Sequence, residues 1–464
     1  MIAPRTTPYV IDALIPSGPY RSRHREELLD VTGAVLGELT IAPPIVVSRA
    51  MSGLRKGKPM PRAARIAALR NAAARYCEEA VAGLDLDTYR HLVSRLTGLG
   101  ITEVSAATER VANSIGNAYD EAQYGRPISV SDDTHSPAAW KGTGLWARRG
   151  DVFAVLAAGN HPAVHAGWLQ ALALGYRVAI RPSRREPLTA HRLVSALHEA
   201  GFSTSDVVML PTTHDGADEI MRASDLAMVY GGQEVIDKYD AKNVLARGPG
   251  RSKILVAAPY DWRDQLDLIA LSVTRGGGTG CTNATCVLVE GDMSTAAELA
   301  QALAERLAQY EPRPPDDPQA LLPAARREVA RGLNAVLAAS ASETIRVLGG
   351  GGVMHELGDS SAVLTPAIQL LSEPAQTQTI AVELPFPCVW VSSWSSADGL
   401  APLRNSVHLT LMTDDEDLIE QSLEDPTIRS TFVGPVPTTF SDPAVPHEGI
   451  ISEFLMTPKG FLRQ

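Results

Sequence analysis

GGGTGCTNATCVLVE, residues 276–290, decides the fold of this 464-residue chain. Its second part, TCVLVE at 285–290, is a short apolar run with β-branched side chains and predicts a buried strand. The preceding residues 261–275 have a helix-like apolar pattern, and KILVAA at 253–258 predicts another strand. Cys281 therefore lies in a glycine-rich loop between a helix and a strand, inside an α/β region.

A further α/β region lies upstream of that one. Residues 62–117 have apolar side chains at helical spacing and predict a helical N-terminal region. Residues 160–175 predict one helix, which Asn160 caps and Gly175 ends. Short apolar runs around this helix alternate with amphipathic segments, as in parallel βαβ units; the runs are VFAVLAA (152–158), YRVAIRP (176–182), DVVML (206–210) and LAMVY (226–230). Two such regions predict two lobes and a cleft between them.

The composition excludes several classes of protein. Hydrophobic residues at 45% and charged residues at 20% are typical of a globular chain. A net charge of -11 gives no broad attraction for nucleic acid or for an anionic membrane. The N-terminus lacks the apolar core of a signal peptide, and no stretch reaches the length of a membrane span, so we expect a cytoplasmic protein.

Four cysteines in a chain of this length are too few for a disulfide scaffold, so free thiols are expected. No CxxC or HExxH pattern occurs, and we expect no metal site. Cys281 stands in an open glycine loop, where a thiol activated by nearby donors or positive charge attacks carbonyl carbons. The alternative for Cys281 is a small buried hydrophobic side chain. Cys77, Cys286 and Cys388 are interpreted as core residues.

Five motifs occur in the order found in the aldehyde dehydrogenase superfamily, which the chain resembles from about residue 151 to 383. Each motif is weak alone, but their order makes the set specific. They are AAGNHPAVHAGW (157–168), RPSRREPLTA (181–190), YGGQEV (230–235), GTGCTNA (278–284) and ELPFP (383–387).

The resemblance implies roles for residues of these motifs. Cys281 is the nucleophile, and Asn160 donates to the oxygen of the tetrahedral adduct. Arg181, Ser183 and Gly231 match positions that contact the cofactor. Glu383 matches the residue that holds the nicotinamide ribose, although Pro385 and Phe386 depart from the family's pattern beside it.

The resemblance also implies an α/β fold with two Rossmann-type lobes and an oligomerisation element. We expect residues 1–130 and 150–252 to form the cofactor-binding domain and residues 253–440 to form the catalytic domain. Residues 131–149 and 441–464 match the bridging element, which implies a homodimer or homotetramer.

The first departure from the family is Arg247, which falls where the family has the glutamate that activates the hydrolytic water. Without that base, hydrolysis of an acyl-cysteine is slow, and exchange with another thiol is favoured. We therefore expect NADPH-dependent reduction of an acyl thioester, bound to coenzyme A or to a carrier protein, to an aldehyde. One alternative is ordinary oxidation of an aldehyde to an acid with Glu234 or Glu383 as the base. Another is a catalytically degenerate relative that acts as a binding subunit.

The second departure concerns the cofactor's ribose. Arg184, followed by Arg185, stands where NAD-preferring relatives often have a glutamate. A guanidinium binds a 2'-phosphate through paired hydrogen bonds, so NADPH is the expected cofactor, with NAD possible. The alternative is a solvated, basic helix start.

The third departure is the pair of histidines in NHPAVHAGW. His161 and His165 take positions that face the substrate tunnel in relatives, and Trp168 matches a family aromatic residue. We expect all three to face the substrate, with one histidine contacting a polar substrate or protonating a departing thiolate. The alternative is core packing or plain tunnel lining.

Overall fold

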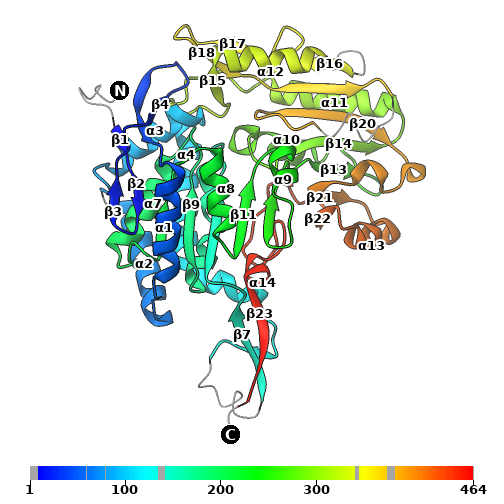
Figure 1. Ribbon diagram of the computed structural model, residues 1–464. Helices are drawn as coiled ribbons and strands as arrows, with labels where there is room; N and C mark the ends of the chain where they lie inside the picture. The colour runs from blue at the N-terminus through cyan, green and yellow to red at the C-terminus, as the bar shows by residue number, and fades with distance from the viewer. Residues whose placement is uncertain are drawn as a thin grey trace.

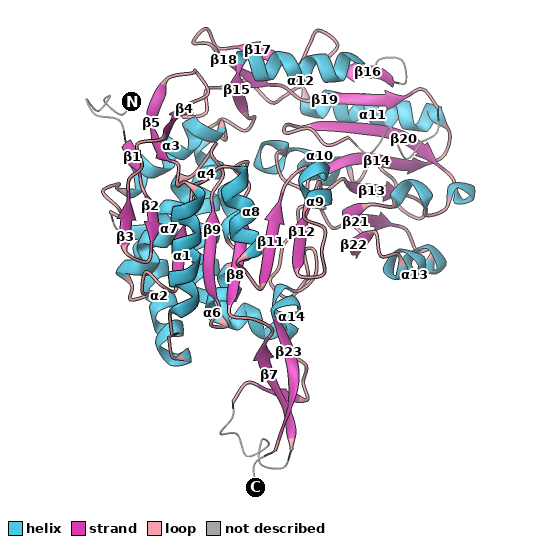
Figure 2. Cartoon of the chain, viewed as in Figure 1, coloured by secondary structure: helices cyan, strands magenta, loops and turns pink. Residues whose placement is uncertain are grey.

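The computed structural model describes residues 9–58, 60–78, 80–133, 142–339, 344–373 and 382–462. Two seven-stranded sheets form the body of the molecule, and a thin ribbon extends from it (Figures 1 and 2). The expected α/β fold with two sheet-based lobes is confirmed.

The first sheet has the order β12-β11-β8-β9-β10-β2-β3, and the strands from β8 to β12 are mutually parallel. The four predicted apolar runs form four of its strands, each ending within two residues of the predicted ends. The sheet comprises β2 (Ala13–Ile15), β3 (Gly18–Tyr20), β8 (Val152–Leu156), β9 (Arg177–Arg181), β10 (Val207–Met209), β11 (Leu226–Tyr230) and β12 (Val244–Arg247).

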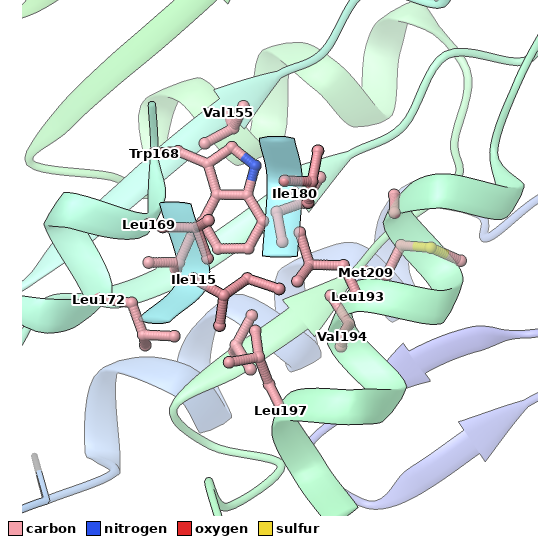
Figure 3. Packing of buried hydrophobic residues seen from close by; sticks show 14 of the residues in the cluster. Ile115, Val155, Trp168, Leu169, Leu172, Ile180, Leu193, Val194, Leu197 and Met209 are labelled. Atoms are coloured by element: carbon pink, nitrogen blue, oxygen red, sulfur yellow. The ribbon is translucent and has the colours of Figure 1, made fainter. Parts of the chain in front are cut away.

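Helices cover both faces of this sheet because successive strand residues point to opposite sides. Phe153 and Val155 pack with one group of helices, while Val152 and Ala154 pack with another. Figure 3 shows Trp168, Val155 and Ile180 within the first group's core. That group is α2 (Arg62–Glu78), α3 (Leu86–Thr97), α4 (Ile101–Ala122) and α7 (Leu188–Glu199); the other is α1 (Pro44–Lys56) and α8 (His214–Arg222).

The second sheet has the order β16-β19-β20-β14-β13-β21-β22, with the edge strand β16 antiparallel to β19. Helices α10 (Leu266–Thr274) and α11 (Met293–Leu307) cover one face, and α12 (Arg327–Ala339) and α13 (Glu416–Glu424) cover the other. The strands are β13 (Ser252–Val256), β14 (Ala284–Glu290), β16 (Thr344–Leu348), β19 (Ala367–Leu371), β20 (Cys388–Trp394), β21 (Ser406–Met412) and β22 (Ile428–Val433).

Three of the four cysteines belong to the packed interior, as predicted. Cys286 and Cys388 are buried in the core of the second sheet, and Cys77 is partly buried against the core of the first. All four cysteines are free thiols.

Three small sheets complete the fold. β5 (Val35–Thr40) lies between β1 (Tyr9–Ile11) and β4 (Arg25–Leu29), and β18 (Ser361–Leu364) lies between β15 (Ala324–Arg326) and β17 (Met354–Glu356). In the third, β7 (Thr143–Arg148) pairs with β6 (Val130–Ser131) and with β23 (Met456–Phe461), which forms the ribbon in Figures 1 and 2.

Apart from Val130, the strands of the third sheet lie in the predicted bridging element, of which residues 134–141 and 463–464 lie outside the described residues. None of the described helices is long and apolar enough to cross a membrane.

The prediction of one helix over residues 160–175 is wrong. The segment forms a 3-10 turn, η2 (Pro162–His165), and a separate short helix, α6 (Leu169–Ala173). His161, not Asn160, caps the first turn, because its Nδ1 accepts the Ala163 N–H at 3.1 Å. Gly167 lies in the break, where a Cβ would approach Ile451 to 2.8 Å. This close contact with the C-terminal segment, together with the low helix propensity of glycine, explains the interruption.

Candidate active site

The loop that carries Cys281 is shaped by its glycines. After α10, Gly276, Gly277 and Gly278 all have positive φ, a conformation that favours glycine. A Cβ on Gly250, from the neighbouring loop, would lie 1.7 Å from the Cys281 carbonyl oxygen. The Ser252 hydroxyl donates to that same carbonyl oxygen at 2.9 Å. The nucleophile's backbone is therefore held closely against the start of β13.

Asn160 reaches this loop from the first lobe, just after β8. Its Nδ2 donates to the Thr279 carbonyl oxygen at 3.1 Å, two residues before Cys281 in the chain. Because a carbonyl only accepts, the contact orients the amide nitrogen toward the loop. Asn160 Oδ1 is buried and has no hydrogen-bond partner within the described part of the chain. The two lobes thus bring together the two residues that the sequence assigned to the chemistry.

Two histidines that the sequence reasoning missed stand behind the thiol. Cys281 Sγ lies 3.4 Å from His447 Nε2, and His447 Nδ1 lies 2.9 Å from His408 Nε2. His408, on β21, is bonded through Nδ1 to the Thr438 carbonyl oxygen. His447 lies in a turn-rich segment of the predicted tail, where the sequence pattern gave no signal of a catalytic site. A chain of imidazoles therefore leads away from the thiol.

Arg247 and Glu448 form an ion pair beside these histidines. Arg247 Nη1 lies 2.8 Å from Glu448 Oε2 and also donates to the Glu448 carbonyl oxygen at 3.1 Å. Both side chains are nearly buried, with exposed fractions of 5% and 9%. Arg247, at the end of β12, consequently holds the residue that follows His447.

One carboxylate oxygen of Glu383 is occupied by two backbone donors of the chain itself. Its Oε2 accepts the backbone N–H groups of Gly250, at 2.6 Å, and Arg251, at 3.0 Å. One carboxylate oxygen thus fixes the loop that packs on Cys281. Glu234, the other carboxylate considered as a base, is exposed on α9 (Gln233–Lys238).

The surroundings of the thiol oppose its ionisation. Burial, and then the negative charges of Glu448 and Glu383, raise the pKa of Cys281 to about 12. Partial removal from solvent, followed by His408 and Arg247, lowers the pKa of His447 below its usual range. At neutral pH the pair is therefore a protonated thiol beside a neutral imidazole, and thiol activation requires proton transfer to a base.

A cavity of about 420 Å³ opens next to Asn160 and Thr279. Its wall includes three guanidinium groups, those of Arg184, Arg185 and Arg326. Arg184 pairs with Glu26 at 2.8 Å, and Arg185 Nη2 donates to the Thr97 carbonyl oxygen at 2.6 Å. Glu27 and Asp30 also line the cavity, so its charge is mixed, and the three guanidinium groups are the part of the wall that suits a ligand with phosphate groups.

The other predicted cofactor residues lie at or just after the ends of β9 and β11, outside the lining of this cavity. Arg181 ends β9, and its Nε is buried without a hydrogen-bond partner among the described residues. Ser183 Oγ accepts the Arg185 N–H at 3.2 Å. Gly231 follows β11, and a Cβ there would meet Val235 at 2.6 Å. The buried Arg181 nitrogen fits an anionic ligand, and the cofactor roles of Arg181, Ser183 and Gly231 stay predictions.

The histidines and tryptophan predicted to face the substrate divide into two groups. His165 and Trp168 are fully buried, and Trp168 Nε1 donates to His165 Nδ1 at 3.2 Å. Trp168 belongs to the core of the first lobe (Figure 3), and His165 is buried against it, so the expectation that they face the substrate does not agree with their placement. His161 remains near the loop, where its Nε2 lies 3.0 Å from Glu103 Oε1, and Glu103 also pairs with Arg110. No group of metal-ligating side chains occurs in the described ranges.

Comparison with known proteins agrees with this architecture. The aldehyde dehydrogenase family profile matches residues 38–413. A mutant of the P. syringae indole-3-acetaldehyde dehydrogenase AldA, in complex with NAD+ and IAA, is 17% identical, with a TM-score of 0.79 and coverage of 97% of this chain and 96% of that chain. Gamma-glutamyl-gamma-aminobutyraldehyde dehydrogenase from Burkholderia cenocepacia is 18% identical, with a TM-score of 0.78 and coverage of 97% and 95%. An NAD-dependent aldehyde dehydrogenase from Sinorhizobium meliloti is 18% identical, with a TM-score of 0.78 and coverage of 98% and 94%.

Proposed function

This chain belongs to the aldehyde dehydrogenase family, whose members are NAD(P)-dependent oxidoreductases acting on aldehydes, and on that premise we propose that it oxidises an aldehyde to an acid through an acyl-cysteine on Cys281. One observation carries the proposal. The Cys281 loop and the Asn160 amide come from different lobes and meet at the end of a cavity with three guanidinium groups. This proposal replaces thioester reduction as the leading interpretation, because the family and its structural neighbours are aldehyde dehydrogenases.

The protein's own residues perform the covalent steps. Cys281 Sγ attacks the aldehyde carbon, and the thiol proton passes to a base. The developing oxyanion accepts the second N–H of Asn160 Nδ2, since the first is bonded to the Thr279 carbonyl. A nicotinamide cofactor bound in the arginine-lined cavity would supply the acceptor for the hydride that leaves this carbon. Water then attacks the acyl-cysteine, and the thiol returns as the acid departs.

The same cavity supports a preference for NADP+ over NAD+. Arg184, Arg185 and Arg326 would hold its phosphate groups, and Arg184 stands where NAD-preferring relatives often have a carboxylate. A guanidinium attracts a 2'-phosphate, whereas a carboxylate repels it. Glu383 would hold the nicotinamide ribose through the oxygen that the backbone of Gly250 and Arg251 does not occupy.

Acyl-thioester reduction is the second candidate. The observation that favours it is the ion pair between Arg247 and Glu448, because the family's hydrolytic glutamate is replaced here by a residue that cannot act as a base. In this reaction an acyl-CoA or acyl-carrier protein acylates Cys281 and releases its thiol. A bound NADPH would supply the hydride that reduces the acyl group to an aldehyde, and the thiol of Cys281 leaves as the thiohemiacetal collapses.

One experiment separates these functions. The protein is incubated with aldehydes and NAD+ or NADP+, with and without coenzyme A, and acid and thioester are quantified. Acid formed without added thiol supports the main proposal, whereas thioester formed only with coenzyme A, and its reversal with NADPH, supports the second. Acyl-Cys281 is identified by mass spectrometry, with Cys281→Ser as the control. Absence of both turnover and acylation contradicts both functions and favours a binding subunit.

Self-association through the ribbon is part of the same proposal. β23 and β6 are the edge strands of the third small sheet, and edge strands offer unpaired backbone groups to another chain. A homodimer or homotetramer is expected, and light scattering coupled to size-exclusion chromatography measures it. A monomer at micromolar concentration contradicts the assembly without affecting the proposed chemistry.

A further inference from the structure

We infer that His447 is the catalytic base that takes and returns the proton of Cys281, and that His408 is the residue that positions it. The inference rests on the proposed function in assigning the nucleophile to Cys281. It stands on a continuous line of contacts: thiol to His447 at 3.4 Å, His447 to His408 at 2.9 Å, and His408 to the Thr438 carbonyl.

The carbonyl at the far end fixes every hydrogen in this line. A carbonyl oxygen only accepts, so His408 Nδ1 carries the hydrogen that it donates to Thr438. A neutral His408 then has a lone pair on Nε2, and His447 Nδ1 must donate to it. The lone pair of neutral His447 is therefore on Nε2, which faces the Cys281 thiol. Each imidazole therefore donates a hydrogen bond away from the thiol, and the lone pair of His447 Nε2 is the acceptor that faces the sulfur.

The terminal carbonyl is itself held in place. The Thr438 N–H donates to Ser272 Oγ, on α10, at 3.2 Å. His408 is 2% exposed and packs edge to face on Phe432, with the ring centroids 4.8 Å apart. These contacts leave His408 little freedom to rotate, so it presents Nε2 to His447 in a constant position.

The loop that presents His447 is anchored on both sides of that residue. Ser430 Oγ donates to the Pro446 carbonyl oxygen before it, and Arg247 binds the side chain and carbonyl oxygen of Glu448 after it. The arginine that replaces the family's base thus secures the segment that supplies another base. Glu448 Oε2 lies 3.8 Å from His447 Nε2, but this carboxylate is shared with Arg247, which together with removal from solvent and His408 lowers the pKa of His447.

The proton balance is complete with these groups and the solvent. As the S–C bond forms, the thiol proton passes to His447 Nε2 and gives an imidazolium. The side chain of His447 is 43% exposed, so it returns this proton to solvent before hydrolysis. Neutral His447 then takes a proton from the water that attacks the acyl-cysteine. The same proton goes to the sulfur as the C–S bond breaks, which regenerates the resting pair.

The first test uses His447→Gln, which keeps a polar side chain of similar length but has no basic nitrogen. His355→Gln is the matched control, because His355 is exposed on β17 of another sheet. We expect kcat for aldehyde oxidation to fall about 100-fold in His447→Gln, within the range for loss of a general base. The rate of Cys281 alkylation by iodoacetamide at neutral pH, followed on the Cys281 peptide by mass spectrometry, is expected to fall about tenfold.

His408 is tested with two variants. His408→Phe keeps a ring against Phe432 but removes the acceptor for His447, and we expect about a tenfold loss of kcat. His408→Gln can place an oxygen where Nε2 was and a donor toward Thr438, so it is expected to recover most of that loss. A merely structural role would predict the opposite order, because phenylalanine suits the buried site better than glutamine.

The alkylation assay separates this inference from the proposed function, because it needs neither aldehyde nor cofactor. If no aldehyde is oxidised but His447→Gln still slows alkylation, the function is wrong and the relay stands. If aldehyde is oxidised while His447→Gln stays within about twofold of the parent in both assays, the relay is overturned and the function stands. If the His408→Phe variant is as active as the parent, His408 does not position His447.

Discussion

Arg247 Nη1 lies 2.8 Å from Glu448 Oε2, and both side chains are nearly buried. The arginine stands where the resemblance places a hydrolytic glutamate, yet the structure gives it a partner and a position in the fold. Its contact holds the segment that carries His447 against the Cys281 loop. The substitution is therefore tied to the architecture of the site and is more than the loss of a base.

Breaking this ion pair on one side is expected to destabilise the protein. Arg247→Met leaves the Glu448 carboxylate buried without its partner, which costs about 3 kcal/mol of unfolding free energy. Urea denaturation followed by circular dichroism measures it. The double variant Arg247→Met/Glu448→Leu removes both charges and is expected to recover most of the loss. An equal free energy of unfolding for the parent and the Arg247→Met variant would show that the ion pair does not stabilise the fold.

Cofactor preference is expected to change at Arg184. Arg184→Glu replaces an attractive group with a repulsive one, so kcat/KM for NADP+ should fall at least tenfold, while that for NAD+ changes little. Glu26→Gln is the complementary variant: it releases Arg184 from its 2.8 Å ion pair and is expected to improve NADP+ binding. A ratio of the two kcat/KM values that is the same in the parent and in Arg184→Glu would exclude this contact with the 2'-phosphate.

The reactivity of the thiol should follow its raised pKa. The pKa of Cys281 is about 12, against 9.0 for an unperturbed cysteine, so the thiolate fraction is small throughout the neutral range. In His447→Gln, where only the thiolate route remains, alkylation is expected to rise about tenfold per pH unit from about pH 8 to about pH 10. Free cysteine under the same conditions levels off near its own pKa. Levelling of the Cys281 rate at that same pH contradicts the raised pKa.

Acid stability should depend on His165. Burial lowers the pKa of His165 from 6.5 to about 4, so the folded state disfavours the protonated form. Above about pH 6.5 His165 is neutral in both the folded and the unfolded state, so its titration does not affect stability there. As the pH falls from 6.5 toward 4, only the unfolded state binds the proton, and the free energy of unfolding decreases. His165→Gln keeps an acceptor for Trp168 and removes this dependence, which amounts to about 2 kcal/mol at about pH 5. Urea denaturation at about pH 7 and pH 5 tests it; identical pH dependence in the parent and the variant contradicts it.

Much of the fold is predictable because local pattern and tertiary burial agree. The run LAMVY forms β11 with the predicted ends, and the strand predicted at 285–290 differs from β14 by one residue. The N-terminal strands β1, β2 and β3 are three residues each, too short for a periodic pattern to emerge. The break near Gly167 depends in part on Ile451, which is distant in sequence, and the glycine is its only local signal.

The candidate site divides in the same way. Cys281 and Asn160 stand in motifs with a definite order, and the sequence assigns them. His447 stands in PAVPHEGI, a turn-rich stretch of the tail, and His408 lies inside an apolar strand. Both histidines become candidates for proton transfer only because the fold brings Cys281, His408 and His447 together. The burial of His165 and Trp168 could not be read from family spacing, since a change of packing leaves the spacing intact.

The bond from Asn160 to the Thr279 carbonyl has a thermodynamic consequence. An amide free to rotate would lose rotational entropy every time it turned a hydrogen toward a substrate oxygen. Here the fold has already fixed the amide plane, and the hydrogen that remains is oriented before any substrate arrives. Such a donor interacts more strongly as negative charge develops on the oxygen, so it favours the transition state over the bound aldehyde. The donor and the carbonyl that orients it belong to different lobes. The orientation of the Asn160 amide therefore depends on how closely the two lobes pack against each other.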